Sequence, residues 1–345
     1  MVSVGPDSEG AFCPARASPC TVPQGKLRSV TGSDFEVLTL GRVSVDLYPS
    51  EIGLPLSQVS SFHKFLGGSP TNMAVAAARS GHASAVITRV GDDGFADFVR
   101  SALRGFGVDD RYVGTDPVLR TPLVFVEIYP PDHFPLLFYR QPKAPDMNTA
   151  VDDLDLDAIR GADIFWTTGT GLSDEPSRTA TFAALEARGG REHTVHDLDF
   201  RPSLWPAPED AGRYQRLALE LASVVVGNEE ECAIVLGPGT PERQATRLLD
   251  CGPELAIVKM GPAGALVAWS GGVERVAPLN IDVVCGLGAG DAFGGALCHG
   301  LLLGWDPVAI LRFANAAGAY VATQLACADA MPTEDQVRDL MGDVV

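Results

Sequence analysis

Short apolar runs alternate with helix-like segments along most of this chain, and no other feature constrains its fold as strongly. Six of the runs have the length and composition of buried strands: EVLTLGRVSV, SAVITRVG, ADIFWTTG, EHTVHDLD, SVVVGN and LAIVKMG. Helical stretches lie between them, for instance at residues 93–106, 175–188 and 241–249. This alternation predicts βαβ units, and therefore an α/β fold in which a mostly parallel sheet carries helices on both faces. Ligands of such sheets bind at the carboxyl ends of the strands, where several of these runs end in Gly, Asn or Asp.

Two stretches break the alternation, because they look like strands and hairpins with no helix between them. One is SSFHKFL, just before Gly67, and the other covers residues 121–141, where YPPDHFP marks a turn by its prolines. We expect a small β-sheet lid, with strands within residues 44–66 and 120–142, over one end of the main sheet.

The two ends of the chain differ from the rest. Residues 1–35 are rich in Pro, Gly and Ser and lack periodicity, which is typical of a disordered extension. We therefore expect one folded domain over residues 36–335 and a short C-terminal tail over residues 336–345.

Charge and cysteine usage exclude several classes of protein. The formal net charge of −18 argues against nucleic acid as a partner, since phosphate binding needs a basic face. No apolar run reaches the length that would span a membrane. The 7 cysteines never form a C-x-x-C pair, so neither a zinc site nor a disulfide framework is expected. Reduced thiols and the absence of a signal-peptide pattern favour a cytoplasmic protein.

The stretch VVCGLGAGDAFGGAL, residues 283–297, is the most specific candidate for chemistry. It lacks the Gly-Lys-Ser/Thr of a Walker A loop, and Asp291 stands where a dinucleotide fingerprint would need its third glycine. It reads as a strand, a glycine turn and a helix from Asp291, so its backbone amides would converge on an anion at the helix N-terminus. A carboxylate there can take a proton from a substrate hydroxyl. The simpler alternative is that Asp291 only caps the helix.

The stretch GGSPTNMAVAAARSG, residues 67–81, predicts a helix with a ligand at its start. Ser69 suits the N-cap position, and Pro70 suits the first turn. Gly67 and Gly68 would let a ligand approach the backbone, and Asn72 offers both a donor and acceptors. The alternative is a well-capped helix that binds nothing.

Together, GGSPTN and GAGDAF resemble the two signatures of the ribokinase-like, or PfkB-type, carbohydrate kinase family, over about residues 35–332. The resemblance implies a three-layer αβα sandwich with a β-strand lid, and ATP and Mg²⁺ as phosphoryl donor and cofactor. It implies Asp291 as the catalytic base and an anion hole formed by Gly288, Ala289 and Gly290. For the sugar, it implies contacts from Gly67, Gly68, Asn72 and Asp46.

The same resemblance implies a nucleotide site. Asn228, in GNEEE, matches a position near the phosphates, and Glu231 matches one that organises magnesium through water. Lys259, Gly261 and Gly264, in VKMGPAG, and Asn315, in FANAAGA, match positions beside the nucleotide. On their own, residues 228–231 read as a surface helix, and Asn315 as a polar residue on a packed helix.

One position departs from the family pattern. Cys285 stands where many members have an aspartate of a monovalent-cation site. This leaves a monovalent-cation requirement open, since backbone carbonyls can also form such a site. We expect Cys285 to be a small packing residue.

Finer segments, such as GRVSVDLYP, FYRQPKAPD and DLDFRPSLW, resemble the 5-dehydro-2-deoxygluconokinase branch of the family, which acts in inositol catabolism on the primary (C6) hydroxyl of a keto sugar acid. Such a substrate needs a cation for its carboxylate. Arg140 is the first candidate, because its planar fork matches two carboxylate oxygens, and Lys143 is the second. Arg201 is a third, unless it pairs with Asp197 or Asp199.

Other functions stay open at this point. The chain could act on 2-keto-3-deoxygluconate, fructose or ribose, or be a non-catalytic sugar or nucleotide sensor. A nicotinamide oxidoreductase is disfavoured by the missing third glycine. Because lidded members of the family often pair through their lid strands, a homodimer is open as well.

Overall fold

The computed structural model describes residues 34–205 and 207–342, and a ten-stranded sheet forms its centre. The strand order is β14-β13-β12-β11-β10-β9-β1-β4-β5, with β6 paired to β4. The bounds are β1 (Val37–Leu40), β4 (Ser84–Gly91), β5 (Val108–Asp109), β6 (Val113–Asp116), β9 (Ile164–Thr168), β10 (Thr194–Asp197), β11 (Val224–Asn228), β12 (Leu255–Lys259), β13 (Ala265–Trp269) and β14 (Gly272–Val276).

Five of the six predicted strand runs are β4, β9, β10, β11 and β12; the sixth, residues 36–45, divides into β1 and the start of β2 (Ser44–Pro49), which belongs to a second sheet. The six neighbouring strands from β4 through β1, β9, β10 and β11 to β12 all pair in parallel. β13 and β14 extend the sheet in antiparallel fashion. The parallel strands are buried almost throughout, which explains why they read as continuous apolar runs rather than as alternating ones. The predicted α/β fold is confirmed.

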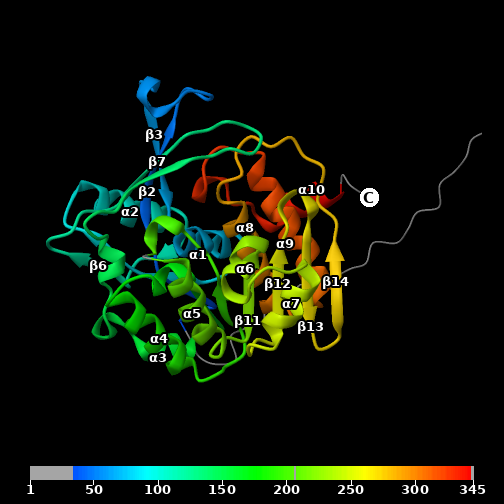
Figure 1. The fold of residues 1–345 in the computed structure, drawn as a ribbon. Coiled ribbons are helices and arrows are strands. Elements are labelled where there is room, and N and C mark those ends of the chain that lie inside the picture. The colour runs from blue at the N-terminus through cyan, green and yellow to red at the C-terminus, as the bar shows by residue number, and fades with distance from the viewer. Residues whose placement is uncertain (1–33, 206, 343–345) are drawn as a thin grey trace, which may run out of the picture.

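Helices cover both faces of the sheet, giving three layers (Figure 1). Alternate strand residues point to opposite faces: Val37 packs in the core with α1, α8 and α9, whereas Leu38 packs with α4 and α5. The helices are α1 (Ser69–Arg79), α2 (Gly94–Gly105), α3 (Leu156–Gly161), α4 (Ser177–Arg188), α5 (Pro208–Leu219), α6 (Glu229–Leu236), α7 (Pro241–Leu249), α8 (Ala289–Leu302), α9 (Pro307–Ala322) and α10 (Glu334–Gly342). Short 3-10 turns are η1 (Leu56–Gln58), η2 (Pro145–Asn148), η3 (Val151–Asp153), η4 (Gly169–Leu172), η5 (Pro202–Leu204), η6 (Gly261–Ala263) and η7 (Ala328–Ala330).

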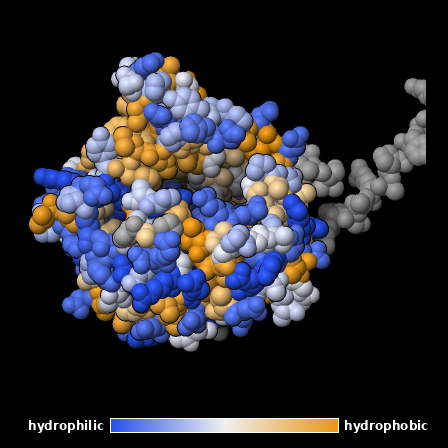
Figure 2. Space-filling model, viewed as in Figure 1, coloured by the Kyte–Doolittle hydropathy of each residue, from blue (hydrophilic) through white to orange (hydrophobic). Residues whose placement is uncertain are grey.

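A second sheet of four strands, ordered β3-β2-β7-β8, forms the lid and rises above the main body (Figure 1). Its strands are β2 (Ser44–Pro49), β3 (Phe62–Gly67), β7 (Leu123–Val126) and β8 (Leu136–Tyr139); only β3 passes the predicted ranges, by one residue. Val124 and Phe138 pair on the inner face, whereas Phe125 and Leu137 pair on the outer face. Apolar surface is visible over this part of the molecule (Figure 2).

The two ends of the domain compare differently with the predicted boundaries. Most of the predicted extension lies outside the described residues, but Phe35 is already buried, and its ring packs edge-on against Tyr112. Most of the expected C-terminal tail belongs to α10, whose Val337 packs in the core. Within the described residues, no helix combines the length and the hydropathy needed to cross a membrane.

Candidate active site

The glycine-rich segment before α8 differs in detail from the prediction. Val283 and Val284 do not form a strand, because the amides of Val284 and Cys285 donate to the carbonyl of Ala322 at the end of α9. The chain then turns at Gly288, whose φ of +82° favours glycine, and α8 begins at Ala289 rather than Asp291. The first amides of a helix have no acceptor within it, so this end of α8 can hold an anion.

Asp291 lies in the first turn of α8 but does not cap it, since Gly288 is the N-cap residue. Its carboxylate instead reaches α1, where it accepts hydrogen bonds from Ser69 Oγ and Asn72 Nδ2, both at 2.7 Å. Ser69 is therefore not the predicted N-cap of α1 either: Gly68 takes that place, and the hydroxyl faces Asp291. Burial raises the pKa of Asp291, and the donors Asn72 and Ser69 oppose the rise.

A small cavity of about 70 Å³ lies between Asp291 and the inner face of the lid. Of the residues expected to bind sugar, Asp46, Gly68, Asn72 and Arg201 line it; lid residues Val124, Leu136 and Phe138 close it. Asn72 Oδ1 is buried and has no hydrogen-bond partner among the described residues, so this oxygen can accept a hydrogen bond from a ligand.

Gly67, the last residue of β3, lies against Asp46, which lines this cavity. A β-carbon at Gly67 would overlap the Asp46 carboxylate, so this position requires glycine. Asp46 accepts a 2.6 Å hydrogen bond from Ser44, and burial raises the pKa of Asp46 to about 6.

Two arginines line the same cavity and share one carboxylate. Asp199 accepts from Arg42 Nη2 at 2.7 Å, and Arg201 Nη2 lies 3.1 Å from its other oxygen. Burial alone would raise the pKa of Asp199, but Arg42 and Arg201 outweigh it and hold this pKa well below its usual range. Arg42 was missed by the sequence analysis, which placed it inside the first strand run; β1 ends at Leu40, so Arg42 lies just beyond the carboxyl end of a strand, where ligands bind.

Arg140 and Lys143 do not line the cavity. The Arg140 guanidinium pairs with Asp146, and both side chains are buried, at 3% and 1% exposure. Lys143 Nζ lies 3.1 Å from Asp174 and also bonds the carbonyl of Glu175. The expectation that the lid hairpin brings these two cations over the sugar is therefore corrected: internal partners hold both away from it.

A larger cavity of about 580 Å³ lies on the other side of the α8 N-terminus. It brings together Lys259, Gly261, Gly264 and Asn315, which the sequence placed beside a nucleotide, with Ala289 and Gly290 of α8. Asn315 Nδ2 donates to the carbonyl of Ala277 at 3.0 Å. Much of the remaining lining is apolar, including Pro278, Leu279, Ile281 and Val283, which suits a planar base.

Asn228 and Glu231 do not line either cavity; they form a reciprocal cap at the start of α6. Glu231 accepts from the amides of Asn228 at 2.7 Å and Phe200 at 3.2 Å, and its carboxylate is buried. No group of three or more potential metal-ligating side chains occurs within the described ranges. A single buried carboxylate such as Glu231 could contact Mg²⁺ only through water, and the other ligands of the ion would be phosphate oxygens and water.

Cys285 packs with Tyr48, Val126, Ile128 and Cys327 in a small apolar cluster beneath the lid. Its thiol is buried, and burial raises its pKa, so it supplies no charged oxygen in place of an aspartate. This is the small packing role that the sequence predicted.

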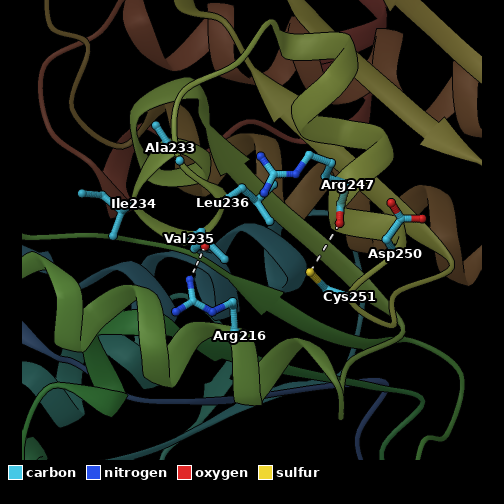
Figure 3. Close-up of a pocket in the computed structure, with 9 residues that line it drawn as sticks. Arg216, Ala233, Ile234, Val235, Leu236, Arg247, Asp250 and Cys251 are labelled. Atoms are coloured by element: carbon cyan, nitrogen blue, oxygen red, sulfur yellow. Dashed lines mark hydrogen bonds between the residues drawn. The ribbon is translucent and has the colours of Figure 1, made fainter.

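A further hollow of about 490 Å³ lies against α6 and the C-terminal end of α7 (Figure 3). Arg216 donates to the carbonyl of Val235 at 2.5 Å, and Cys251 Sγ donates to the carbonyl of Arg247 at 3.3 Å. None of the predicted site residues lines it. Most of the predicted site residues instead line the two other cavities, which meet at the first turn of α8.

Comparison with known sequences agrees with this geometry: the pattern of the pfkB family carbohydrate kinases matches residues 34–334. The chain belongs to this family. It is an ATP-dependent carbohydrate kinase, and similar proteins include 5-dehydro-2-deoxygluconokinases. The one from Shouchella clausii is 33% identical over 90% of this chain and 96% of its own length. The one from Clostridium tetani is 32% identical over 89% and 93%.

Solved structures of related kinases share the fold, including the lid. A putative ribokinase II from E. coli, in complex with ATP and Mg²⁺, matches with a TM-score of 0.82 and 25% identity, over 89% of this chain and 99% of its own. A fructokinase from Vibrio cholerae, bound to fructose, ADP and a potassium ion, matches with a TM-score of 0.79 and 28% identity, over 90% and 99%.

Proposed function

We propose that this kinase phosphorylates the primary C6 hydroxyl of 5-dehydro-2-deoxy-D-gluconate in inositol catabolism. The observation that carries the proposal is the shared first turn of α8: Asp291 faces the lid cavity, while Ala289 and Gly290 face the larger cavity. A sugar in the first cavity and ATP in the second would meet across this turn. The similarity to kinases of that name supports the choice of sugar.

Asp291 is the general base in this proposal. Hydrogen bonds from Ser69 and Asn72 fix its carboxylate, so its proton-accepting lone pairs keep one direction. The amides of Gly288, Ala289 and Gly290 form the anion hole, since charge that develops on the transferring group meets the N-terminal end of α8. Mg²⁺, when bound, would neutralise phosphate charge, with Glu231 holding its water shell. The protein contributes mainly position and charge.

The carboxylate of the substrate needs a cation, and Arg201 is the candidate that lies at the cavity. Its side chain is 40% exposed, whereas Arg42 and Asp199 behind it are buried, at 7% and 3%. Asp199 therefore orients both guanidiniums while leaving Arg201 accessible. We assign the carboxylate to Arg201, supported by Arg42, in place of Arg140 and Lys143.

The lid cavity is smaller than the roughly 300–1,000 Å³ of pockets that hold small molecules. Its volume is about 70 Å³, with Phe138 of the lid and Asp291 both on its wall. Entry of a six-carbon acid then requires the inner lid residues, such as Phe138, to move outward. Closure over the bound sugar would exclude water from the transfer.

The test is ADP production by the purified protein with MgATP and one of four sugars: 5-dehydro-2-deoxygluconate, 2-keto-3-deoxygluconate, fructose or ribose. We expect the highest kcat/KM for the first. Preference for 2-keto-3-deoxygluconate would keep the arginine assignment and overturn the substrate. Preference for fructose or ribose would overturn both. No turnover with any of them, despite ATP binding, would favour a sensor.

A further inference from the structure

Lys259 occupies the boundary between the larger cavity and the anion hole. It is the last residue of β12, and it lines the cavity that we assign to ATP. A β-carbon at Gly290 would lie 3.4 Å from Lys259 Nζ, so the ammonium sits directly against the first turn of α8. An oxygen held by the Gly290 amide would therefore be within reach of the ammonium as well.

Carboxylates behind Lys259 keep it charged and hold it in place. Nζ lies 3.9 Å from Asp197 Oδ1 at the end of β10, and the two side chains are 20% and 5% exposed. Burial lowers the pKa of Lys259, but Asp197, Glu231 and Asp291 outweigh it and raise this pKa above its usual value. Nζ makes no hydrogen bond with any described residue, so its three donors are available to a ligand.

We propose that Lys259 is a catalytic residue that binds the phosphoryl group during transfer, and that Asp197 is the residue that positions it. The inference rests on the proposed placement of the transfer at the first turn of α8. In the step, the sugar oxygen bonds to the γ-phosphorus while the bond from that phosphorus to the β–γ bridging oxygen breaks. The bridging oxygen leaves on ADP with the electron pair, and the hydroxyl proton passes to Asp291.

The Lys259 ammonium would stabilise the transition state most at the oxygens on which negative charge accumulates. In a loose transition state, charge builds on the leaving oxygen and the equatorial oxygens of the transferring group. A donor that is fixed before the reaction stabilises this charge with no reorganisation, which is why such groups contribute to kcat rather than to ground-state binding. Arg201 lines the other cavity, so Lys259 is the cation on the ATP side.

The first experiment compares Lys259→Met and Lys259→Arg with the full-length wild type, using whichever sugar the wild type phosphorylates best. We expect Lys259→Met to lower kcat about 10²- to 10³-fold, as for loss of one preorganised donor, with a much smaller change in the Kd for MgATP. Lys259→Arg should recover part of the loss, because it restores the charge but not the geometry. Lys64→Met, a lid lysine that lies over the Phe98 ring, is the matched control.

A raised Kd for MgATP with wild-type kcat at saturation would overturn the proposal, because Lys259 would then bind ground state and transition state alike. Since Kd is measured without sugar, this outcome is separate from a failed choice of substrate. A near-normal turnover of Asp291→Asn would instead remove the proposed transfer site itself.

The second experiment is a double-mutant cycle with Asp197→Asn, which keeps the side-chain shape and removes its charge. If Asp197 acts through Lys259, Asp197→Asn should lower kcat in the wild type and cost little further in Lys259→Met. Equal losses in both backgrounds would show that Asp197 acts independently and would overturn its positioning role. Thermal unfolding of each variant separates these losses from a loss of folded protein.

Discussion

Ser69 Oγ donates a hydrogen bond of 2.7 Å to Asp291 Oδ1, which joins the first residue of α1 to the first turn of α8. Asn72, one turn further along α1, holds the other carboxylate oxygen. The early and late glycine motifs, 222 residues apart between these two side chains, are thus one hydrogen-bonded unit. The proposed base is therefore oriented by the helix that the sequence assigned to sugar binding alone.

Removing the Ser69 donor should shift the pH dependence of catalysis. Asp291 must be ionised to accept a proton, so activity falls as the pH drops through its pKa. Burial raises this pKa, and the Ser69 and Asn72 donors lower it by stabilising the ionised form. Ser69→Ala should therefore move the acidic limb of the kcat/KM profile to higher pH. Ser80→Ala, at the other end of the same helix, should leave the limb in place.

An unshifted acidic limb in Ser69→Ala would mean that another group controls that limb. The profile is therefore recorded for both variants over the same pH range and in the same buffers. Thermal unfolding at each pH excludes a loss of folded protein.

Asp291→Asn should abolish most turnover while leaving binding intact. The amide keeps the shape and the contact with Ser69 but cannot take a proton, so we expect kcat to fall about 10²- to 10⁴-fold. The Kd values for sugar and for MgATP should change little. Single-turnover kinetics at saturating substrate measure the effect on chemistry, and near-wild-type rates would contradict the assignment of the base.

Variants of Arg201 and Arg42 should differ in their effects: loss of Arg201 should affect substrate recognition, and loss of Arg42 should also affect the stability of the fold. Arg201→Gln should reduce kcat/KM for the sugar acid about 10- to 100-fold, as expected for lost charged hydrogen bonds, with little effect on a neutral sugar. Arg42→Met leaves Asp199 buried beside only one arginine, so it should also lower the free energy of unfolding, by less than the about 3–5 kcal/mol of a buried charge left with no partner. Equal losses for acid and neutral sugars in Arg201→Gln would rule out carboxylate recognition.

The sequence predicts the parallel strands of the fold better than it predicts the segment before α8. The parallel strands were predictable because burial on both faces leaves an apolar run with turn residues at each end, as in SVVVGN. Val283 and Val284 look the same but stay outside the sheet, because the carbonyl that their segment meets belongs to Ala322. A local pattern does not reveal that partner.

The candidate site shows the same limit of sequence-based prediction, because a local pattern does not reveal the partners of a side chain. Lys259 lies at the larger cavity because it is the last residue of β12, and Asp291 lies at the lid cavity because it is in the first turn of α8. The cation for the substrate could not be ranked from sequence, since Arg140 and Arg201 differ only in their partners. Arg140 pairs with Asp146 six residues on, whereas Arg201 shares Asp199 with Arg42, far away in the chain.

Arg140→Ala should therefore act on stability rather than on specificity. It leaves Asp146 as an unpaired buried carboxylate, which typically costs about 3–5 kcal/mol, so the melting temperature should drop. Where the protein remains folded, the ratio of kcat/KM between acid and neutral sugars should stay at its wild-type value. A selective loss of activity on the acid would restore Arg140 as the carboxylate ligand.

We predict that the outer face of the lid pairs with a second copy of the chain in solution. Leu137 and Tyr139 of β8 are 47% and 60% exposed, and the Tyr139 ring contacts Phe125, which in turn contacts Phe62. Contiguous exposed apolar surface of this kind marks interaction sites, and a second lid is the surface that complements it through symmetry. We expect a dimer by light scattering after size exclusion, and a monomer for the double variant Leu137→Lys, Tyr139→Lys. Leu217→Lys, at a similarly exposed leucine on α5, should remain dimeric. A wild-type monomer at all concentrations, or a dimer that survives both lid charges, would show that the lids do not pair.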